Sequence, residues 1–408
     1  MKVLHLVHNY PPEFAGGTEI YLQALVREQL RLGFEVLLLV GSETRSPHPT
    51  LTEETAACPR VVRFRRAENE HYRVDFRPRG LKGFLASLAD RFRPHVVHVH
   101  HWFNLGNDIV AFLSGRGFPV ILTLHDLYAG CPRIFMIRPD GFFCGQLLPV
   151  PVDRCVECVA PDYNPPGLRA EIQQRRRLMG RELERAARVI VPSTSHASML
   201  ARTRLVSAER LTILGHGLLN VIRPDDRQPK PGVLRLGTWG HLSRVKGIVE
   251  LLSALRRLHE RYPGKVELHL FGRPTPDFGE ELTDLCKGLP VHLHGAYKTE
   301  EMSRFSREID LALFPSHAHE SYSFVLDEAC ALRILAIVSD RGALADRGRR
   351  FAETVDPTDP GAIAAAVERY LVKPELLEER RALLPEQPFS IAHHAERLSK
   401  IYAEVVPR

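Results

Sequence analysis

Residues 311–329 have the sequence LALFPSHAHESYSFVLDEA, in which an apolar run is followed by a polar loop and a second apolar pattern. The run Leu311–Phe314 predicts a buried strand, and residues 323–332 predict the helix that follows it. A strand that leads into a helix through a short loop is the repeating unit of a parallel sheet. At such a junction the backbone N–H groups of the first helical turn can hold a phosphate group.

The same alternation of short apolar runs and longer helical patterns extends over the rest of the chain. It predicts an α/β protein in which parallel strands are joined by crossover helices. Strands are expected at residues 3–7, 36–40, 61–64, 96–99, 120–124, 189–191, 211–214, 233–236, 266–271, 291–294, 311–314 and 335–338. Helices are expected at residues 18–32, 81–93, 105–115, 168–187, 195–202, 248–262, 280–288, 300–306, 323–332 and 394–405.

A polar passage at residues 220–231 contains three prolines and lacks apolar periodicity, which predicts an interdomain linker. The two halves of the chain, before and after this passage, begin in the same way, with a strand, a glycine-containing loop and a helix. We therefore expect two doubly wound, Rossmann-like domains facing a cleft, with the ligand at the carboxyl ends of the strands. The expected divisions are a first domain at 1–220 with a Cys-rich insertion at 128–167, a second domain at 221–390, and a helix at 391–408 that crosses back to the first domain.

The 408 residues have the composition of an ordinary globular protein, with 25% charged side chains. No apolar stretch approaches the roughly 20 residues that span a bilayer, and the first apolar run is too short for a signal peptide. We therefore expect a cytoplasmic protein. The net charge of +6 favours an anionic partner. Because no nucleic-acid-binding module is visible, we do not expect that partner to be nucleic acid.

Two glutamates lie at the junction that follows Phe314. Glu320 precedes the expected helix, and Glu328 lies about one turn inside it. Since eight helical residues span about 12 Å, the two carboxylates could bind hydroxyl groups on either side of a pyrophosphate. Their spacing alone also fits a purely structural interpretation, with one side chain at the helix start and one solvated helix carboxylate.

Glu320 and Glu328, with seven residues between them, resemble the E-x7-E motif of the retaining glycosyltransferases of family four, which have the GT-B fold. Three further segments resemble motifs of that family in the same order. These are its first glycine loop at 11–19 (PPEFAGGTE), its sugar-facing histidine loop at 123–126 (TLHD) and its phosphate-binding loop at 240–247 (GHLSRVKG). Each motif is weak alone, so the strength of the resemblance comes from their order along residues 1–345.

The resemblance implies transfer of a sugar from a nucleoside-diphosphate sugar to an acceptor hydroxyl with retention of configuration, in the synthesis of cell-surface glycans or glycoconjugates. The acceptor would be a glycan, a lipid-linked molecule or a small molecule, and catalysis would require no cofactor. The catalytic residues would be His125, Lys246 and Glu320. The donor-binding residues would be Gly16, Gly17, His241, Arg244, Ser323, Phe324, Val325 and Glu328.

Within that resemblance, Lys246 and the residue five positions before it hold the donor diphosphate. Glu328 binds the ribose hydroxyls, Glu320 and His125 orient the transferred sugar, and Gly17 brings backbone close to the reacting phosphate. A glycine suits this last position because no Cβ blocks the approach.

The sequence departs from the family pattern at two donor-binding positions. His241 replaces the usual arginine, and a neutral histidine offers one donor where arginine offers a permanently charged fork. Arg244 in the same loop could replace that charge, His241 could be protonated, or the diphosphate could be held more weakly. Ser323 replaces a usual glycine, although its backbone N–H is retained with those of Phe324 and Val325.

Four cysteines, Cys131, Cys144, Cys155 and Cys158, lie in the Gly- and Pro-containing insertion. One C-x2-C pair with two further cysteines resembles a structural zinc loop. The spacing also fits two disulfides or four free thiols. Four cysteine ligands would leave no open position on zinc for catalysis.

Two other charged or titratable runs have weaker interpretations. In residues 95–101, His98 and His100 would share one face of a strand, and without an acidic partner they fit strand-end packing or an acceptor-site lining. The Arg-rich helix expected at 168–187 fits a solvated face. It could also attract an anionic membrane, which would place the protein peripherally at the inner face of that membrane.

Two other classes of function are alternatives to glycosyl transfer. A non-catalytic nucleotide-sugar-binding homologue is compatible with His241. A dinucleotide-dependent oxidoreductase is compatible with doubly wound domains, but neither glycine loop has the G-x-G-x-x-G pattern of such enzymes.

Overall fold

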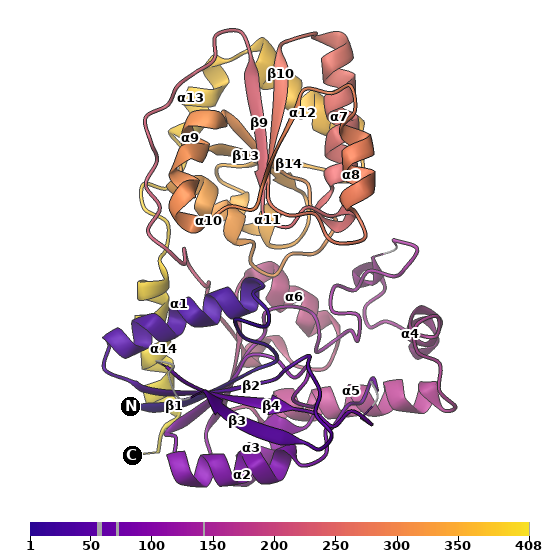
Figure 1. Ribbon diagram of the computed structural model, residues 1–408, viewed down its shortest axis with the longest axis vertical. Helices are drawn as coiled ribbons and strands as arrows, with labels where there is room; N and C mark the ends of the chain where they lie inside the picture. Colours follow the sequence, from indigo (N-terminus) through magenta and orange to yellow (C-terminus); the bar gives the residue numbers. More distant parts are fainter. Residues whose placement is uncertain (55–58, 71–72, 142, 408) are drawn as a thin grey trace. The chain divides into compact units, whose positions relative to one another are not determined.

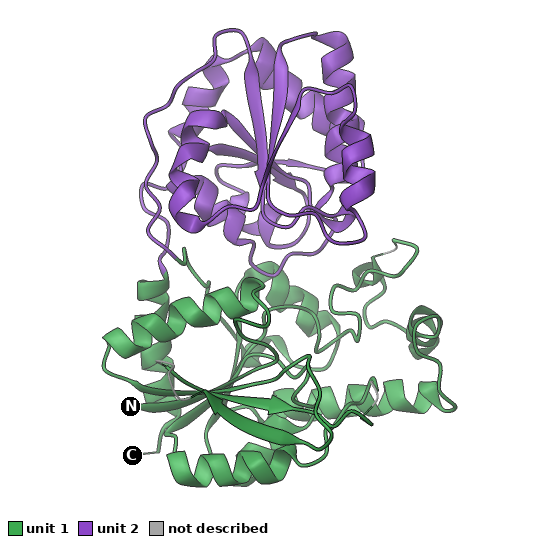
Figure 2. Cartoon of the chain, viewed as in Figure 1, with its two compact units in different colours: residues 1–219, 391–408 green, residues 220–390 purple. Residues whose placement is uncertain are grey.

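The computed structural model describes residues 1–54, 59–70, 73–141 and 143–407 (Figure 1). The chain forms two compact units (Figure 2). Unit 1 consists of residues 1–219 together with the segment that starts at Ile391, and unit 2 consists of Asn220–Ser390.

Unit 1 contains an eight-stranded sheet in the order β3-β4-β2-β1-β5-β6-β7-β8. All neighbouring strands are parallel except β3, which pairs antiparallel with β4 at the edge. The strands are β1 (Lys2–Val7), β2 (Glu35–Val40), β3 (Thr50–Glu54), β4 (Arg60–Arg65), β5 (Val96–Val99), β6 (Val120–Thr123), β7 (Arg188–Val191) and β8 (Leu211–Ile213). The helices are α1 (Gly17–Arg31), α2 (Leu81–Phe92), α3 (Ile109–Gly115), α4 (Val152–Val159), α5 (Leu168–Arg185), α6 (Thr194–Arg202) and α14 (Ile391–Val405), with short 3-10 helices η1 (Cys144–Leu147) and η2 (Ala208–Arg210).

Unit 2 contains a six-stranded, wholly parallel sheet in the order β11-β10-β9-β12-β13-β14. The strands are β9 (Leu234–Trp239), β10 (Val266–Phe271), β11 (Val291–Gly295), β12 (Leu311–Phe314), β13 (Leu335–Ser339) and β14 (Glu353–Val355). The helices are α7 (Ile248–Arg261), α8 (Gly279–Cys286), α9 (Phe305–Glu308), α10 (Phe324–Ala331), α11 (Gly342–Gly348), α12 (Pro360–Val372) and α13 (Glu375–Arg381), with 3-10 helices η3 (Arg244–Lys246) and η4 (Thr299–Arg304).

These two units confirm the expected α/β fold with two parallel-sheet domains. The central strands are buried and mostly apolar, because helices cover both faces of a doubly wound sheet. Buried polar side chains such as His5 of β1 and His98 of β5 interrupt the apolar runs. The expected helix at 105–115 begins only at Ile109, since the buried residues Trp102 and Leu105 lie in the preceding loop.

Helix α14 packs against α1 within unit 1, although unit 2 separates them in the sequence (Figure 1). The backbone N–H of Ile391 donates to the carbonyl of Leu218, 3.0 Å away. The buried side chains Leu398 and Tyr402 lie on the covered face of the helix. The last helix is therefore part of the helical layer of unit 1 that contains α1. None of the helices in the described part of the chain combines the length and the apolar character needed to cross a bilayer.

Candidate active site

The strand order of unit 2 creates a crevice beside β9 and β12. These strands are neighbours, and the chain continues from them in opposite directions, to β10 and β11 on one side and to β13 and β14 on the other. The loops that follow β9 and β12 therefore lie at the switch point of the sheet, at its carboxyl edge, which is where open α/β sheets bind ligands.

The loops after β9 and β12 touch through Gly247. This residue has a φ of +73°, and a Cβ there would lie 1.9 Å from the carbonyl oxygen of Pro315. The backbone N–H of His317 also donates to the carbonyl of Val245, 2.8 Å away. Glycine at 247 is thus required both by its conformation and by the close approach of the second loop.

This contact brings Lys246 and Glu320 together. The Lys246 Nζ atom lies 2.6 Å from Glu320 Oε1, and the Ser316 hydroxyl donates to the same oxygen at 2.8 Å. Burial would raise the pKa of Glu320, but the cation and the hydroxyl outweigh it and lower this pKa below its ordinary value. Glu320 is therefore a carboxylate at neutral pH, held beside a cation that remains partly exposed.

Glu328 lies in the first turns of α10 and accepts a hydrogen bond from Trp239 Nε1, 2.8 Å from its Oε2 atom. Burial raises the pKa of Glu328 to about 7, with a smaller contribution from the neighbouring Asp327. Asp327 is itself paired with Arg347 of α11. Glu328 thus has the environment of a carboxyl group whose charge changes near neutral pH.

The helix α10 starts at a strained residue. Ser323 precedes it with φ +66° and ψ +84°, a region that favours glycine. The side chain of Arg347 holds this turn by donating to the carbonyls of Tyr322 and Ser323, at 2.8 and 3.2 Å. The first N–H groups of α10, those of Phe324 and Val325, have no acceptor within the helix, as in any α-helix.

The loop after β9 contains two further candidates, Arg244 and His241, which have other surroundings than Lys246. Arg244 forms ion pairs with Glu281 of α8 and with Asp277, and its guanidinium lies 5.2 Å from the ring centre of Phe278. His241 is exposed. Arg244 is therefore already paired with carboxylates in this structure.

In unit 1 the glycine loop leads from β1 into α1. Gly16 caps the helix, its N–H donates to Glu19 Oε2 at 2.9 Å, and a Cβ on Gly16 would meet the Phe14 ring at 2.8 Å. Gly17 is the first residue of α1. The buried Glu19 also pairs with His8, at 3.1 Å.

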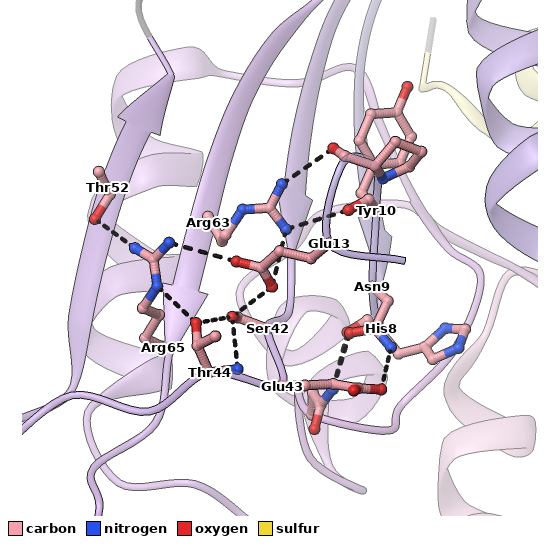
Figure 3. Close-up of polar contacts among 12 residues, drawn as sticks. His8, Asn9, Tyr10, Glu13, Ser42, Glu43, Thr44, Thr52, Arg63 and Arg65 are labelled. Atoms are coloured by element: carbon pink, nitrogen blue, oxygen red, sulfur yellow. Dashed lines mark hydrogen bonds and ion pairs between the residues drawn. The ribbon is translucent and has the colours of Figure 1, made fainter. Parts of the chain in front are cut away.

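The residues before this glycine loop are anchored by Arg63 of β4 (Figure 3). Its guanidinium, which is only 2% exposed, lies 3.4 and 3.2 Å from the carbonyl oxygens of Tyr10 and Pro11. It also pairs with Glu54 at 2.8 Å and with Glu13 at 3.5 Å. A single buried cation therefore holds the backbone of the loop and a carboxylate within it.

His125 follows β6 at the carboxyl edge of the unit 1 sheet and is buried. Its Nε2 atom lies 3.0 Å from Nδ1 of His100, and its ring packs against Tyr21 and His216. Burial lowers the pKa of His125 to about 3, so this imidazole is neutral.

Residues 15–218 match the family Glycosyltransferase Family 4, and residues 231–373 match the family Glycosyl transferases group 1. The chain belongs to glycosyltransferase family 4.

Two curated relatives are similar over nearly the whole chain of this glycosyltransferase. A glycogen synthase of Mycobacterium tuberculosis strain H37Rv is 24% identical over 93% of this chain and 88% of its own length. An alpha-maltose-1-phosphate synthase of Mycolicibacterium smegmatis is 25% identical over 99% of this chain and 100% of its own.

Solved structures share the fold of the glycosyltransferase. Sucrose-phosphate synthase from Thermosynechococcus elongatus aligns with a TM-score of 0.66 at 19% identity, covering 99% of each chain. HepE from Anabaena, solved in complex with UDP-glucose, aligns with a TM-score of 0.62 at 15% identity, covering 99% of this chain and 100% of its own.

In this glycosyltransferase the predicted residues fall into two sets. Lys246, Glu320, Glu328 and the turn at 323–325 share the carboxyl edge of unit 2, whereas Gly16, Gly17 and His125 belong to unit 1. Sequence reasoning missed Trp239, Ser316 and Arg347, which position these side chains. Only Trp239 offered a signal, because an indole that ends a strand before the glycine loop lies at the same carboxyl edge.

The four cysteines of the insertion line one pocket of the glycosyltransferase. They are free thiols, so the structure contains no disulfide among them. Burial raises the pKa of Cys131 to about 11. Among the described residues, the three groups of potential metal ligands within 4.8 Å of one another consist of histidines and glutamates and contain no cysteine.

Proposed function

We propose that this glycosyltransferase moves a sugar from a nucleoside-diphosphate sugar to an acceptor hydroxyl with retention of configuration. The observation that carries the proposal is the Lys246–Glu320 pair, 2.6 Å apart, beside the start of α10. This arrangement offers a cation and helix N–H groups for a diphosphate and a carboxylate for sugar hydroxyls. The UDP and UDP-glucose complexes of HepE from Anabaena support a donor of this class.

Each group has a proposed task in the reaction. Lys246 and the N–H groups of Phe324 and Val325 stabilise the negative charge that develops on the leaving diphosphate. Glu320 accepts hydrogen bonds from the transferred sugar, and Glu328 accepts them from the ribose. From unit 1, Gly17 allows close backbone approach and His125 orients the sugar.

Retention follows if the acceptor attacks the face from which the diphosphate leaves. The anomeric carbon–phosphate oxygen bond breaks, the acceptor oxygen bonds to the same carbon, and the acceptor proton moves to the departing phosphate oxygen. This route needs no protein nucleophile. The protein contributes charge stabilisation and orientation.

The test begins with thermal stabilisation and slow hydrolysis in a panel of nucleoside-diphosphate sugars. Lys246→Ala and Glu320→Ala should each lower turnover by about 10²- to 10³-fold, with folding retained. Lys287→Ala removes an exposed lysine that is paired with Asp284, and it should leave turnover unchanged. Wild-type rates in Lys246→Ala or Glu320→Ala, or binding of no donor, would refute the assignment.

A second candidate is a nucleotide-sugar-binding protein without transferase activity. It is favoured by the pairing of Arg244 with acidic side chains and by His241 at the usual arginine position. Donor binding without hydrolysis or transfer to any acceptor would establish this candidate instead.

We propose that the acceptor is a glycan, a lipid-linked molecule or a small molecule, and that the reaction belongs to cell-surface glycan synthesis. We also propose that the protein acts in the cytoplasm, at the inner face of the membrane. Helix α5 offers a basic surface, but Arg175 is buried against Tyr128 and Arg176 bonds to Val150 and Cys155. The arginines of α5 that are exposed and could contact a membrane are Arg169, Arg177, Arg181 and Arg185. Co-sedimentation with anionic but not neutral vesicles would support this contact, and equal binding to both would contradict it.

We also propose that the cysteine pocket binds one structural zinc ion. Four thiols around one pocket are a suitable donor set, and zinc would draw their sulfurs to about 3.8 Å from one another. Metal analysis should find one zinc per chain, lost in Cys155→Ser with Cys158→Ser and retained in Cys286→Ser. A substoichiometric trace in the unaltered protein would contradict the proposal.

A further inference from the structure

A row of buried histidines crosses three neighbouring strands of unit 1. His5 lies on β1, His98 and His100 on β5 or at its end, and His125 beyond β6. Their side chains are at most 8% exposed. The proposed mechanism uses only His125, so the other three rings require an account of their own.

The rings form one hydrogen-bonded line that begins at Gln29 of α1. Gln29 Oε1 lies 2.8 Å from His5 Nε2, and His5 Nδ1 lies 2.9 Å from His100 Nε2. His100 Nδ1 then lies 3.0 Å from His125 Nε2. A branch runs from Gln29 Nε2 to the Tyr402 hydroxyl at 3.2 Å and from there to His98 Nδ1 at 2.6 Å.

These contacts already occupy the nitrogens that a metal would need. His5, His98 and His100 lie close enough to share an ion, but both ring nitrogens of each residue take part in hydrogen bonds. The second nitrogen of His98 lies 2.7 Å from the Thr123 hydroxyl. The row is therefore better explained as a hydrogen-bonded relay than as a metal site.

Because the imidazole rings are neutral, the donor and the acceptor of each hydrogen bond in the row can be assigned. Burial lowers the pKa of His5 to about 4 and that of His100 well below its ordinary value. A neutral imidazole has one donor and one acceptor nitrogen. Because the Gln29 oxygen can only accept, His5 donates from Nε2, and its Nδ1 must accept from His100 Nε2. His100 Nδ1 in turn accepts from His125 Nε2.

We propose that Gln29 is a positioning residue that acts through His5 and His100 to fix His125 as the Nε2–H tautomer, with Nδ1 as an acceptor. This inference rests on the proposed role of His125 in orienting the sugar. The tautomer decides whether Nδ1 accepts a hydrogen bond from a hydroxyl group or donates one to it, so a fixed tautomer fixes the rotation of that hydroxyl group. The same line also holds the ring plane of His125.

Nitrogen NMR of the unaltered protein with 15N-labelled histidine tests the relay directly. His5, His100 and His125 should all report the Nε2–H tautomer. His394 provides an internal reference of the opposite kind, because its Nδ1 lies 2.7 Å from the Gly215 carbonyl oxygen, which can only accept. An Nδ1–H signal for His125, assigned by its loss in His125→Gln, would overturn the proposal whether or not any variant folds.

Two variants separate positioning from general packing. Gln29→Met should mix the tautomers of His125 and lower kcat by about tenfold or more, while the donor KM changes less than kcat. Gln29→Glu keeps an acceptor facing His5 and should restore the Nε2–H signal and much of kcat. Thr123→Val removes an equally buried partner on the His98 branch, and the His125 signal should stay unchanged.

The outcomes distinguish this inference from the proposed function. If the unaltered protein transfers no sugar, the function fails, whereas the NMR signals still decide the relay. If the protein is active and Gln29→Met changes neither the His125 tautomer nor kcat, the relay fails and the function stands.

Discussion

At the scale of single residues, the pKa of Glu328 predicts that donor binding depends on pH. This pKa is raised by burial to about 7. In the proposed donor site, the ionised carboxylate accepts hydrogen bonds from the two ribose hydroxyls better than the protonated acid does. The ionised fraction rises about tenfold between pH 6 and pH 8. Donor affinity should therefore increase with pH and level off above pH 8, with a Kd about tenfold lower than at pH 6. Calorimetric titration at several pH values measures this.

A matched variant isolates that carboxyl group. The diphosphate of the donor stays fully ionised over this range, so the pH dependence reports on the protein. Glu328→Gln keeps an acceptor for the Trp239 N–H but cannot ionise, and its weaker binding should be independent of pH. A variant that retains the tenfold dependence would assign it to another group.

Ser323 carries a conformational strain that can be removed. A serine at φ +66° is disfavoured by about 1–2 kcal/mol, part of which is offset by the greater chain entropy of glycine in the unfolded state. Ser323→Gly should raise the free energy of unfolding of unit 2 by about 0.5–1 kcal/mol, measured by urea titration. Ser321→Gly, outside the left-handed region, should lower it by a similar amount, and equal signs for both would contradict this explanation.

The positions of the proposed site residues at the carboxyl edges of the two sheets were predictable, because these residues follow strand ends in the sequence. Lys246, Glu320 and His125 lie in loops directly after apolar runs, and parallel strands bring such loops to one edge. Their supporting residues were not predictable. Arg347 and Gln29 act across long sequence separations, and helical periodicity does not say which neighbour a polar side chain meets.

At the scale of elements, β4 supports the glycine loop through Arg63. Arg63→Met removes the buried cation from Glu54 and from Glu13, which keeps Arg65 as a partner, and should cost about 1.5–3 kcal/mol of stability. Amide hydrogens at residues 9–16 should exchange faster. Arg65→Met lies on the same strand with 30% of its side chain exposed and should cost less than about 1 kcal/mol. Equal losses would contradict the anchoring role.

In the described part of the chain, two strands and four α-helices were not expected from the sequence, namely β3, β14, α4, α11, α12 and α13. Three of them have weak patterns. The edge strand β3 reads Thr-Leu-Thr-Glu-Glu and buries little, and β14 has three residues, so neither has the apolar run of a central strand. Helix α4 lies in the cysteine insertion, where prolines and glycines obscure its short periodic pattern. Central strands were found because burial on both faces makes them mostly apolar.

At the scale of the whole molecule, α14 is required by unit 1 and not by unit 2. Truncation after Ser390 removes Tyr402 from His98 and Gln29, and His394 from Tyr21. Calorimetry should then lose the unfolding transition of unit 1 and keep that of unit 2. Truncation after Val405, which spares all of these contacts, should keep both transitions. Two intact transitions in the shorter chain would show that unit 1 is complete without α14.

The place of α14 also sets an order of events on the ribosome. Unit 2 is encoded between β8 and α14, so all of it is synthesised before the segment that closes unit 1. Until α14 is synthesised, the buried histidines of the unit 1 sheet lack their contacts with this helix. Unit 2 contains all of its strands and helices by then. We therefore expect the C-terminal half of this glycosyltransferase to reach its native state first.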